Sequence, residues 1–152
     1  MSSHQVASAA APALDVVVGL ILDRQGRVLV SQRTDGTHME GFWEFPGGKR
    51  GALEGRREAL DRELDEELGI RILKAQPLMV IGHDYPDRCV WLDVWVVQTY
   101  EGEPAPRERQ SIAWILPQDL GSLKLLPADQ PIIEALLDWT PKSESGVVPK
   151  AT

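Results

Sequence analysis

Four carboxylates fall within five residues between Glu63 and Glu67, with no basic residue among them. On a helix, Glu63, Glu66 and Glu67 stand at positions i, i+3 and i+4 and project from one face. Like charges at this spacing destabilise a helix unless a positive charge lies among them. Because carboxylate oxygens are the preferred ligands of hard cations, this face could bind Mg²⁺ or Mn²⁺. The helix alone leaves open a second interpretation, a solvated acidic surface.

The segment that carries these glutamates has the pattern of an amphipathic helix. Leu60, Leu64 and Leu68 repeat at intervals of four residues over 55–68 and form one apolar stripe. Gly69 follows where a left-handed helix cap is expected. Upstream, Gly47 and its neighbouring glycine come directly after a short apolar strand, so the backbone can approach a phosphate or a metal closely there.

The remaining elements place this helix in a mixed α/β fold. The first two strands, on either side of a turn at 23–26, are expected to form a hairpin. In the last helix, Ile132, Ile133, Leu136 and Leu137 are expected to face the core, and Pro131 suits the first turn. Strands and helices do not alternate regularly, which favours a mixed-sheet sandwich over a doubly wound parallel sheet. We expect strands at 14–22, 27–32, 42–45, 78–83, 88–100 and 111–116, and helices at 55–68 and 131–139.

Length and charge narrow the class of protein. The 152 residues suffice for one domain, which we place at 14–140, with flexible tails at 1–13 and 141–152. A net charge of −7 argues against bulk binding to nucleic acid but not against binding one nucleotide. No apolar stretch is long enough to cross a membrane. The lone Cys89 fits a reducing cytoplasm, where we expect a monomer, with a dimer as the alternative.

The acidic helix and the glycines together resemble the Nudix family. Its signature is Gly, five residues, Glu, seven residues, then Arg-Glu-aliphatic-x-Glu-Glu-x-Gly-aliphatic, and a chance match at all fixed positions is negligible. The resemblance implies the Nudix fold, a mixed β-sheet sandwiched between α-helices with a loop–helix–loop signature. The matching residues are Gly48, Glu54, Arg62, Glu63, Leu64, Glu66, Glu67, Gly69 and Ile70.

Outside the signature, the chain is similar to the MutT-type branch of this family over residues 14–139. This likeness implies a Mg²⁺-dependent diphosphatase, with Mn²⁺ as a substitute, that hydrolyses 8-oxo-dGTP to the monophosphate and pyrophosphate. Such an enzyme removes damaged nucleotides before DNA replication. Its reaction would be in-line attack by an activated water on the β-phosphorus. The similar segments are Gln32-Arg33, His38-Met39, Trp43–Lys49, Pro86–Arg88 and Glu101–Pro104.

The same resemblance implies a role for each site residue. Glu63 would be a general base or a further metal ligand. Arg62 would orient the glutamates by salt bridges. The implied catalytic residues are Arg62, Glu63, Glu66 and Glu67. The implied metal ligands are the Gly47 carbonyl, Glu63, Glu66, Glu67 and Glu108. The implied substrate contacts are Arg33, Glu44, Phe45, Pro46, Gly47, Lys49, Asp87 and Asp129.

Two departures from the MutT-type pattern bear on substrate and loop shape. Asp129 stands where that branch has an asparagine, and related CTP pyrophosphohydrolases carry an aspartate in a similar context. An ionised aspartate only accepts hydrogen bonds, so a CTP or dCTP pyrophosphohydrolase is the alternative function. Helix N-capping is the structural alternative for Asp129.

The signature loop also departs from the pattern, because Gly51 and Leu53 replace residues usual there. A regulatory Nudix domain that binds without cutting is a further alternative, although such domains typically lose signature glutamates.

Overall fold

The computed structural model describes residues 13–139. The predicted tails lie outside this range, except that Ala13 already belongs to the first strand. The elements are β1 (Ala13–Ile21), β2 (Val28–Gln32), β3 (Trp43–Glu44), β4 (Gly47–Lys49), α2 (Arg56–Leu68), β5 (Arg71–Tyr85), β6 (Arg88–Glu101), β7 (Ile112–Ile115), the 3-10 helices η1 (Pro117–Ser122) and η2 (Pro127–Asp129), and α3 (Gln130–Asp138).

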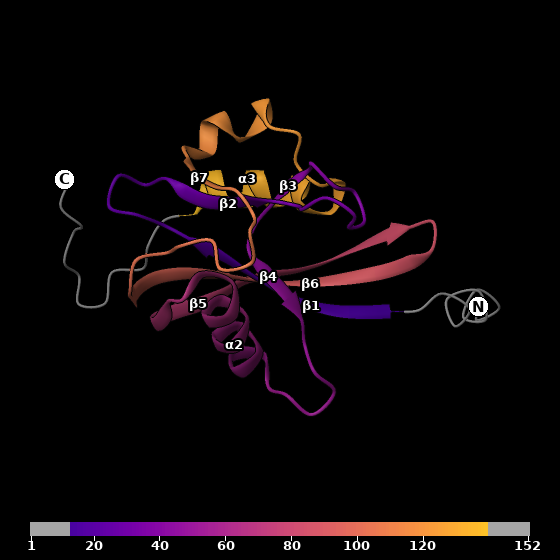
Figure 1. Cartoon of the computed structure of the whole chain (residues 1–152), viewed down its shortest axis with the longest axis horizontal. Coiled ribbons are helices and arrows are strands. Elements are labelled where there is room, and N and C mark those ends of the chain that lie inside the picture. Colours follow the sequence, from indigo (N-terminus) through magenta and orange to yellow (C-terminus); the bar gives the residue numbers. More distant parts are fainter. Residues whose placement is uncertain (1–12, 140–152) are drawn as a thin grey trace.

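The strands form two sheets, and helices lie on both sides of the larger one (Figure 1). The four-stranded sheet has the order β4-β1-β6-β5, with β1 parallel to β6 and the other pairs antiparallel. The three-stranded sheet has the order β3-β2-β7. In Figure 1, α2 covers one face of the four-stranded sheet, and the smaller sheet and α3 cover the other. The expected mixed α/β fold is confirmed. No helix within residues 13–139 is long and apolar enough to cross a membrane.

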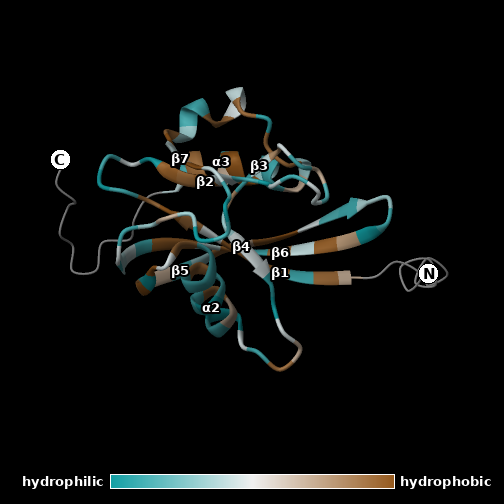
Figure 2. Ribbon diagram, in the orientation of Figure 1, coloured by the Kyte–Doolittle hydropathy of each residue, from teal (hydrophilic) through white to brown (hydrophobic). Residues whose placement is uncertain are grey.

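The second half of β1, residues 17–21, is buried on both faces and joins the two halves of the core. Val18 and Leu20 belong to the apolar cluster shared with β6 and α3, whereas Val17 and Ile21 belong to the cluster under α2. Figure 2 shows the matching hydrophobic colouring of the inner strands. The predicted stripe of α2 is confirmed, since its four apolar residues are fully buried: Ala59, Leu60, Leu64 and Leu68.

The predicted hairpin between the first two strands is wrong. Only one isolated bridge, between Leu22 and Val28, links them, and β2 continues into the other sheet. Asp23 closes the expected turn by accepting hydrogen bonds from the backbone N–H groups of Gln25 and Arg27. However, β4 and β6 occupy both edges of β1, so no edge is left for β2. Strand β4, which was not among the predicted strands, takes one of those edges.

Two further expectations need correction. The strand predicted at 78–83 is the end of a much longer edge strand, β5. Pro77 interrupts its pattern and lies at a register shift, which an edge strand tolerates because one side of its backbone needs no partner. In α3, Leu137 does not face the core, since it is 51% exposed. The other three predicted residues of that helix are buried or pack against the core: Ile132, Ile133 and Leu136.

Truncating Leu64 tests the packing of α2 on the sheet. Its Cδ1 lies 3.0 Å from where a Cβ on Gly19 would be, so the helix sits directly on β1. We expect Leu64→Ala to lower the free energy of unfolding by about 3 kcal/mol, because it opens a cavity in a buried cluster. Leu137→Ala makes the same chemical change at an exposed site and should cost less than about 0.5 kcal/mol in the same urea titration. Equal losses would contradict this packing.

Candidate active site

One cavity gathers most of the residues predicted to act on substrate. Its volume is about 430 Å³, within the range of small-molecule sites. Strands of both sheets, α2, η2 and the segment before β7 contribute to its wall. The predicted site residues that line it are Arg33, Glu44, Phe45, Gly47, Lys49, Glu67, Glu108 and Asp129.

The cavity has an acidic end at Glu67. Burial raises the pKa of this carboxyl, and the nearby carboxylates of Glu63, Glu108 and Glu44 raise it further, to about 9. A carboxyl surrounded by other carboxyls and removed from water resists ionisation. This end of the cavity therefore concentrates negative charge that a bound cation would offset.

Two glycines of β4 allow close packing beside this acidic end, Gly47 against β1 and Gly48 against Glu63 of α2. A Cβ on Gly48 would lie 2.3 Å from the carboxyl carbon of Glu63, and one on Gly47 would lie 2.0 Å from the carbonyl oxygen of Val17. A side chain at position 47 would collide with the backbone of β1, so glycine is required there. A side chain at position 48 would force the carboxyl of Glu63 to move away from the place that it occupies.

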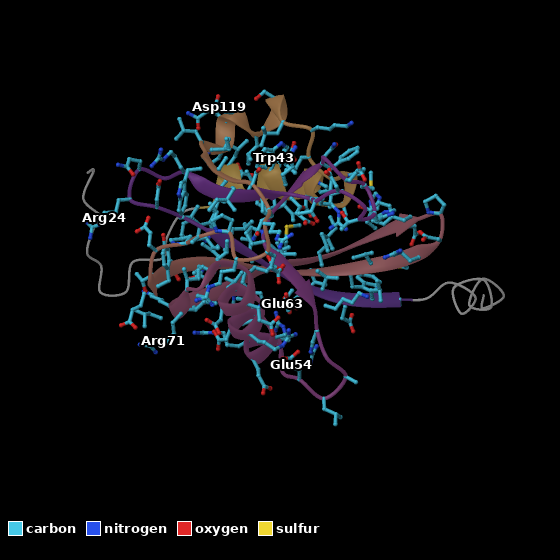
Figure 3. All side chains as sticks on the ribbon, viewed as in Figure 1. Arg24, Trp43, Glu54, Glu63, Arg71 and Asp119 are labelled. Atoms are coloured by element: carbon cyan, nitrogen blue, oxygen red, sulfur yellow. The ribbon has the colours of Figure 1, made fainter. Side chains whose placement is uncertain are left out.

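Arg62 holds the glutamates of the signature in place. It donates from Nε and Nη2 to the carboxylate of Glu54, at 2.6 and 2.9 Å, and from Nη1 to Glu63 and Glu66, at 3.0 and 3.2 Å. Hydrogen bonding from Arg62 is the main reason that the pKa of Glu54 is lowered to about 2. In Figure 3, the labelled Glu54 and Glu63 lie close together beside α2. Arg62 thus faces carboxylates, whereas Glu66 is exposed and is not part of the cavity lining.

The atypical signature loop is held by Glu54 as well. Its carboxylate accepts a hydrogen bond from the backbone N–H of Gly51 at 2.8 Å, and its carbonyl accepts one from Nε of Arg50 at 2.7 Å. Leu53 is fully exposed at the tip of this loop. The unusual residues therefore leave the Glu54–Arg62 link intact.

The carboxylates near this end of the cavity are chemically suited to bind a hard divalent cation. Carboxylate oxygens are the ligands that Mg²⁺ and Mn²⁺ prefer. Among residues 13–139, no group of three or more His, Cys, Asp or Glu side chains is arranged to hold a metal ion. Glu63 and Glu66 are turned to Arg62 instead. To ligate a cation together with Glu67, these two carboxylates would have to leave the guanidinium.

At the opposite end, Asp129 is buried and accepts a hydrogen bond from the backbone N–H of Phe45 at 3.0 Å. Burial raises its pKa to about 8, although that hydrogen bond opposes the shift. The raised pKa favours the neutral carboxyl, which can donate as well as accept. Asp129 occupies the N-cap position of α3, but its side chain makes no capping hydrogen bond.

An ion pair borders the pocket beside Asp129. Nη1 of Arg33 lies 3.1 and 3.2 Å from the carboxylate oxygens of Glu44, and Nε of Arg33 donates to the carbonyl of His38. Burial raises the pKa of Glu44, and Arg33 opposes that shift. The aromatic ring of Tyr85 meets His38 edge-on, with ring centroids 5.6 Å apart. This end thus combines polar groups with an aromatic wall.

The structure leaves two predicted substrate residues outside the lining and adds others. Asp87 is exposed and pairs with Arg88, which does line the cavity, whereas Pro46 lies between two lining residues without belonging to the lining. Three apolar residues of β1 also line the cavity: Leu14, Val16 and Val18. The alternation of side chains along a strand could have predicted that these three lie on one face. The lining residues with functional groups that sequence reasoning did not assign include His38, Tyr85, Arg88 and Gln110.

Comparisons with known proteins agree with this architecture. A NUDIX domain matches residues 17–135. The chain is 36% identical over 121 residues to the CTP pyrophosphohydrolase of Escherichia coli K12, covering 80% of this chain and 90% of that protein. It is 33% identical over 123 residues to the 8-oxo-dGTP diphosphatase of the same strain, covering 81% and 95%. A structure from a study of MutT from Aliivibrio salmonicida and Vibrio cholerae matches with 32% identity and a TM-score of 0.71, covering 82% and 97%.

The chain belongs to the Nudix family. Its signature, its mixed fold and its relatives make it a Nudix hydrolase similar to MutT. Nudix hydrolases generally use a divalent metal ion, which agrees with the carboxylates at the acidic end of the cavity.

The raised pKa of Asp129 predicts a pH-dependent contribution to stability. Unfolded, the carboxyl ionises near its ordinary value of 3.8; folded, it keeps its proton up to about 8. The unfolded state therefore binds fewer protons between these values, and stability falls as pH rises through this window. Asp129→Asn removes the ionisable group, so its Tm relative to the unmodified protein should rise between pH 5 and pH 9. A Tm difference that stays constant over this range would contradict the burial argument.

Proposed function

We propose that this chain hydrolyses 8-oxo-dGTP to 8-oxo-dGMP and pyrophosphate, and so removes oxidised guanine nucleotides from the precursor pool. The proposal rests on one cavity whose lining combines the buried carboxyl of Asp129 with the acidic residues Glu67 and Glu108. A nucleoside triphosphate has the matching polarity, with a hydrogen-bonding base at one end and an anionic chain at the other. The relatives named 8-oxo-dGTP diphosphatase support this substrate class.

The protonated form of Asp129 supports oxidised guanine as the base. A neutral carboxyl offers one donor and one acceptor, which is the pattern of the asparagine in the MutT-type branch. It can therefore donate to a carbonyl oxygen and accept from an N–H of the same base edge. Glu44 and Arg33, which lie next to it, would supply further polar contacts.

A cytosine nucleotide is the second candidate substrate. The relative named CTP pyrophosphohydrolase is 36% identical to this chain, and the aspartate at position 129 follows the pattern of that group. When ionised, Asp129 would accept a hydrogen bond from the amino group of cytosine. Since the pKa of Asp129 lies near 8, the two states are close in free energy, and a base that favours either could bind.

We propose Mg²⁺, with Mn²⁺ as a substitute, as the cation of this site. Glu67, Glu108 and the carbonyl of Gly47 would hold it, with Glu63 and Glu66 joining after release from Arg62. When bound, the cation would neutralise charge on the pyrophosphate and on these carboxylates.

Side chains of this protein would bind the phosphates of the substrate and accept a proton from the attacking water. Lys49 lines the cavity near the acidic end and would bind a phosphate oxygen. Glu63, which is largely buried against Gly48 and pairs with Arg62, would take the proton of the attacking water after release from that arginine. That water would attack the β-phosphorus in line, and the bond between this phosphorus and the oxygen that bridges it to the α-phosphorus would break. Nucleoside monophosphate and pyrophosphate would leave. A cytoplasmic location and a monomeric state stay predictions.

A substrate panel tests the proposed function. Pyrophosphate release with Mg²⁺ should be fastest, as kcat/KM, for 8-oxo-dGTP among 8-oxo-dGTP, dGTP, CTP and dCTP. The reason is that a neutral Asp129 pairs with the oxidised guanine edge. Preference for the cytosine nucleotides would move the chain to the second candidate, and release from none of the four would rule out both.

Replacing Glu67 tests the acidic end. Glu67→Gln removes a carboxyl that would ionise on binding the cation, so kcat/KM should fall by at least about a hundredfold. Glu101→Gln is a matched control, because Glu101 is an exposed glutamate whose carboxylate pairs with Arg71 rather than lining the cavity. The Glu101→Gln variant should keep kcat/KM within about twofold of the value for the unmodified protein. Comparable losses in both variants would argue that Glu67 has no special role.

A further inference from the structure

The segment that brings Glu108 to the cavity is attached to the C-terminal end of α2. Backbone N–H groups of Ala105 and Arg107 donate to the carbonyls of Leu68 and Glu67, both at 3.0 Å. Nη1 of Arg107 donates to the carbonyl of Asp65 at 3.3 Å. The last carbonyls of a helix have no partners within the helix, so these donors satisfy them.

Gln110 adds a more specific link at the same place. It is one of three buried polar or charged residues within 13–139 and is only 9% exposed. Its Oε1 accepts a hydrogen bond from the backbone N–H of Glu108 at 2.8 Å. Its Nε2 donates to the backbone carbonyl of Glu67 at 3.1 Å. One side-chain amide therefore joins the backbones of Glu67 and Glu108, two of the acidic residues that line the cavity.

The backbone between Glu108 and Gln110 takes an unusual conformation. Arg109 has a φ of 65°, in the left-handed region that residues other than glycine rarely adopt. Such a conformation persists only where the surrounding structure enforces it. The hydrogen bond from Glu108 to the Gln110 side chain spans this residue and closes the turn.

We propose that Gln110 is a positioning residue that sets the separation of Glu67 and Glu108 and so prepares them to bind the divalent cation. This inference rests on the proposed function, in which both glutamates are ligands. Gln110 acts through the two backbones and touches neither carboxylate in the contacts described above. A primary amide suits this role because it presents one donor and one acceptor at a fixed spacing.

The direct test is binding of Mn²⁺ alone, measured from the EPR signal of the free ion, without substrate. Gln110→Ala should weaken Mn²⁺ binding about tenfold, as expected for a residue that orients metal ligands. In a Glu108→Gln background the same change should weaken binding by less than about twofold, because its target is already lost. Equal effects in the two backgrounds, or no effect in the first, would overturn the proposal.

Two variants separate positioning from a general loss of structure. Gln110→Asn keeps a buried amide but is one methylene shorter and cannot span both groups, so it should weaken Mn²⁺ binding as Gln110→Ala does. Arg107→Ala removes a hydrogen bond to the same helix end without contacting Glu108, and should leave Mn²⁺ affinity within about twofold. Normal binding by Gln110→Asn, or an equal loss in Arg107→Ala, would contradict the inference.

Failure of the inference differs from failure of the proposed function. If the unmodified protein hydrolyses 8-oxo-dGTP with Mg²⁺ while Gln110→Ala binds Mn²⁺ normally, only the role of Gln110 is wrong. If the unmodified protein releases no pyrophosphate from any triphosphate, the proposed function fails whatever the Mn²⁺ measurements show.

Discussion

The close approach of α2 to β4 is the constraint on which the site depends. Gly48 has no side chain, and the carboxyl of Glu63 lies within 2.5 Å of where one would begin. The buried leucines of α2 hold the helix at this distance from β1. The like charges that the helix then presents are offset by Arg62, which bonds three glutamates. Packing and electrostatics therefore act together: the apolar stripe sets the distance, and the arginine makes the crowding of carboxylates tolerable.

Burial perturbs a carboxyl at each end of the cavity, with different consequences. At Glu67, burial combines with the negative charge of three other glutamates, and the resulting pKa of about 9 marks a place where a cation would be stabilised. At Asp129, burial dominates, and the pKa of about 8 gives a neutral group that both donates and accepts hydrogen bonds. The same physical cause thus prepares one end for a metal and phosphate, and the other for a nucleobase.

Residue patterns predicted what depends on local sequence and missed what depends on the sheet as a whole. The stripe of α2 and the cap at Gly69 followed from helical spacing, and the mixed fold followed from the order of elements and the Nudix signature. The β1–β2 hairpin failed because both edges of β1 are taken by strands distant in sequence. The protonation of Asp129 depends on its burial, and the link made by Gln110 depends on a loop folding back onto α2. The spacing of residues along the chain predicts neither the burial of Asp129 nor the contacts of Gln110.

In the proposed function, one nucleotide spans the cavity from Glu67 to Asp129. A crystal structure with Mn²⁺ and 8-oxo-dGMP would test it most directly, with the metal located by its anomalous scattering. We expect Mn²⁺ against Glu67 and Glu108 and the oxidised base within hydrogen-bonding distance of Asp129. Mn²⁺ bound away from these glutamates, or a base placed outside the pocket at Asp129, would contradict it.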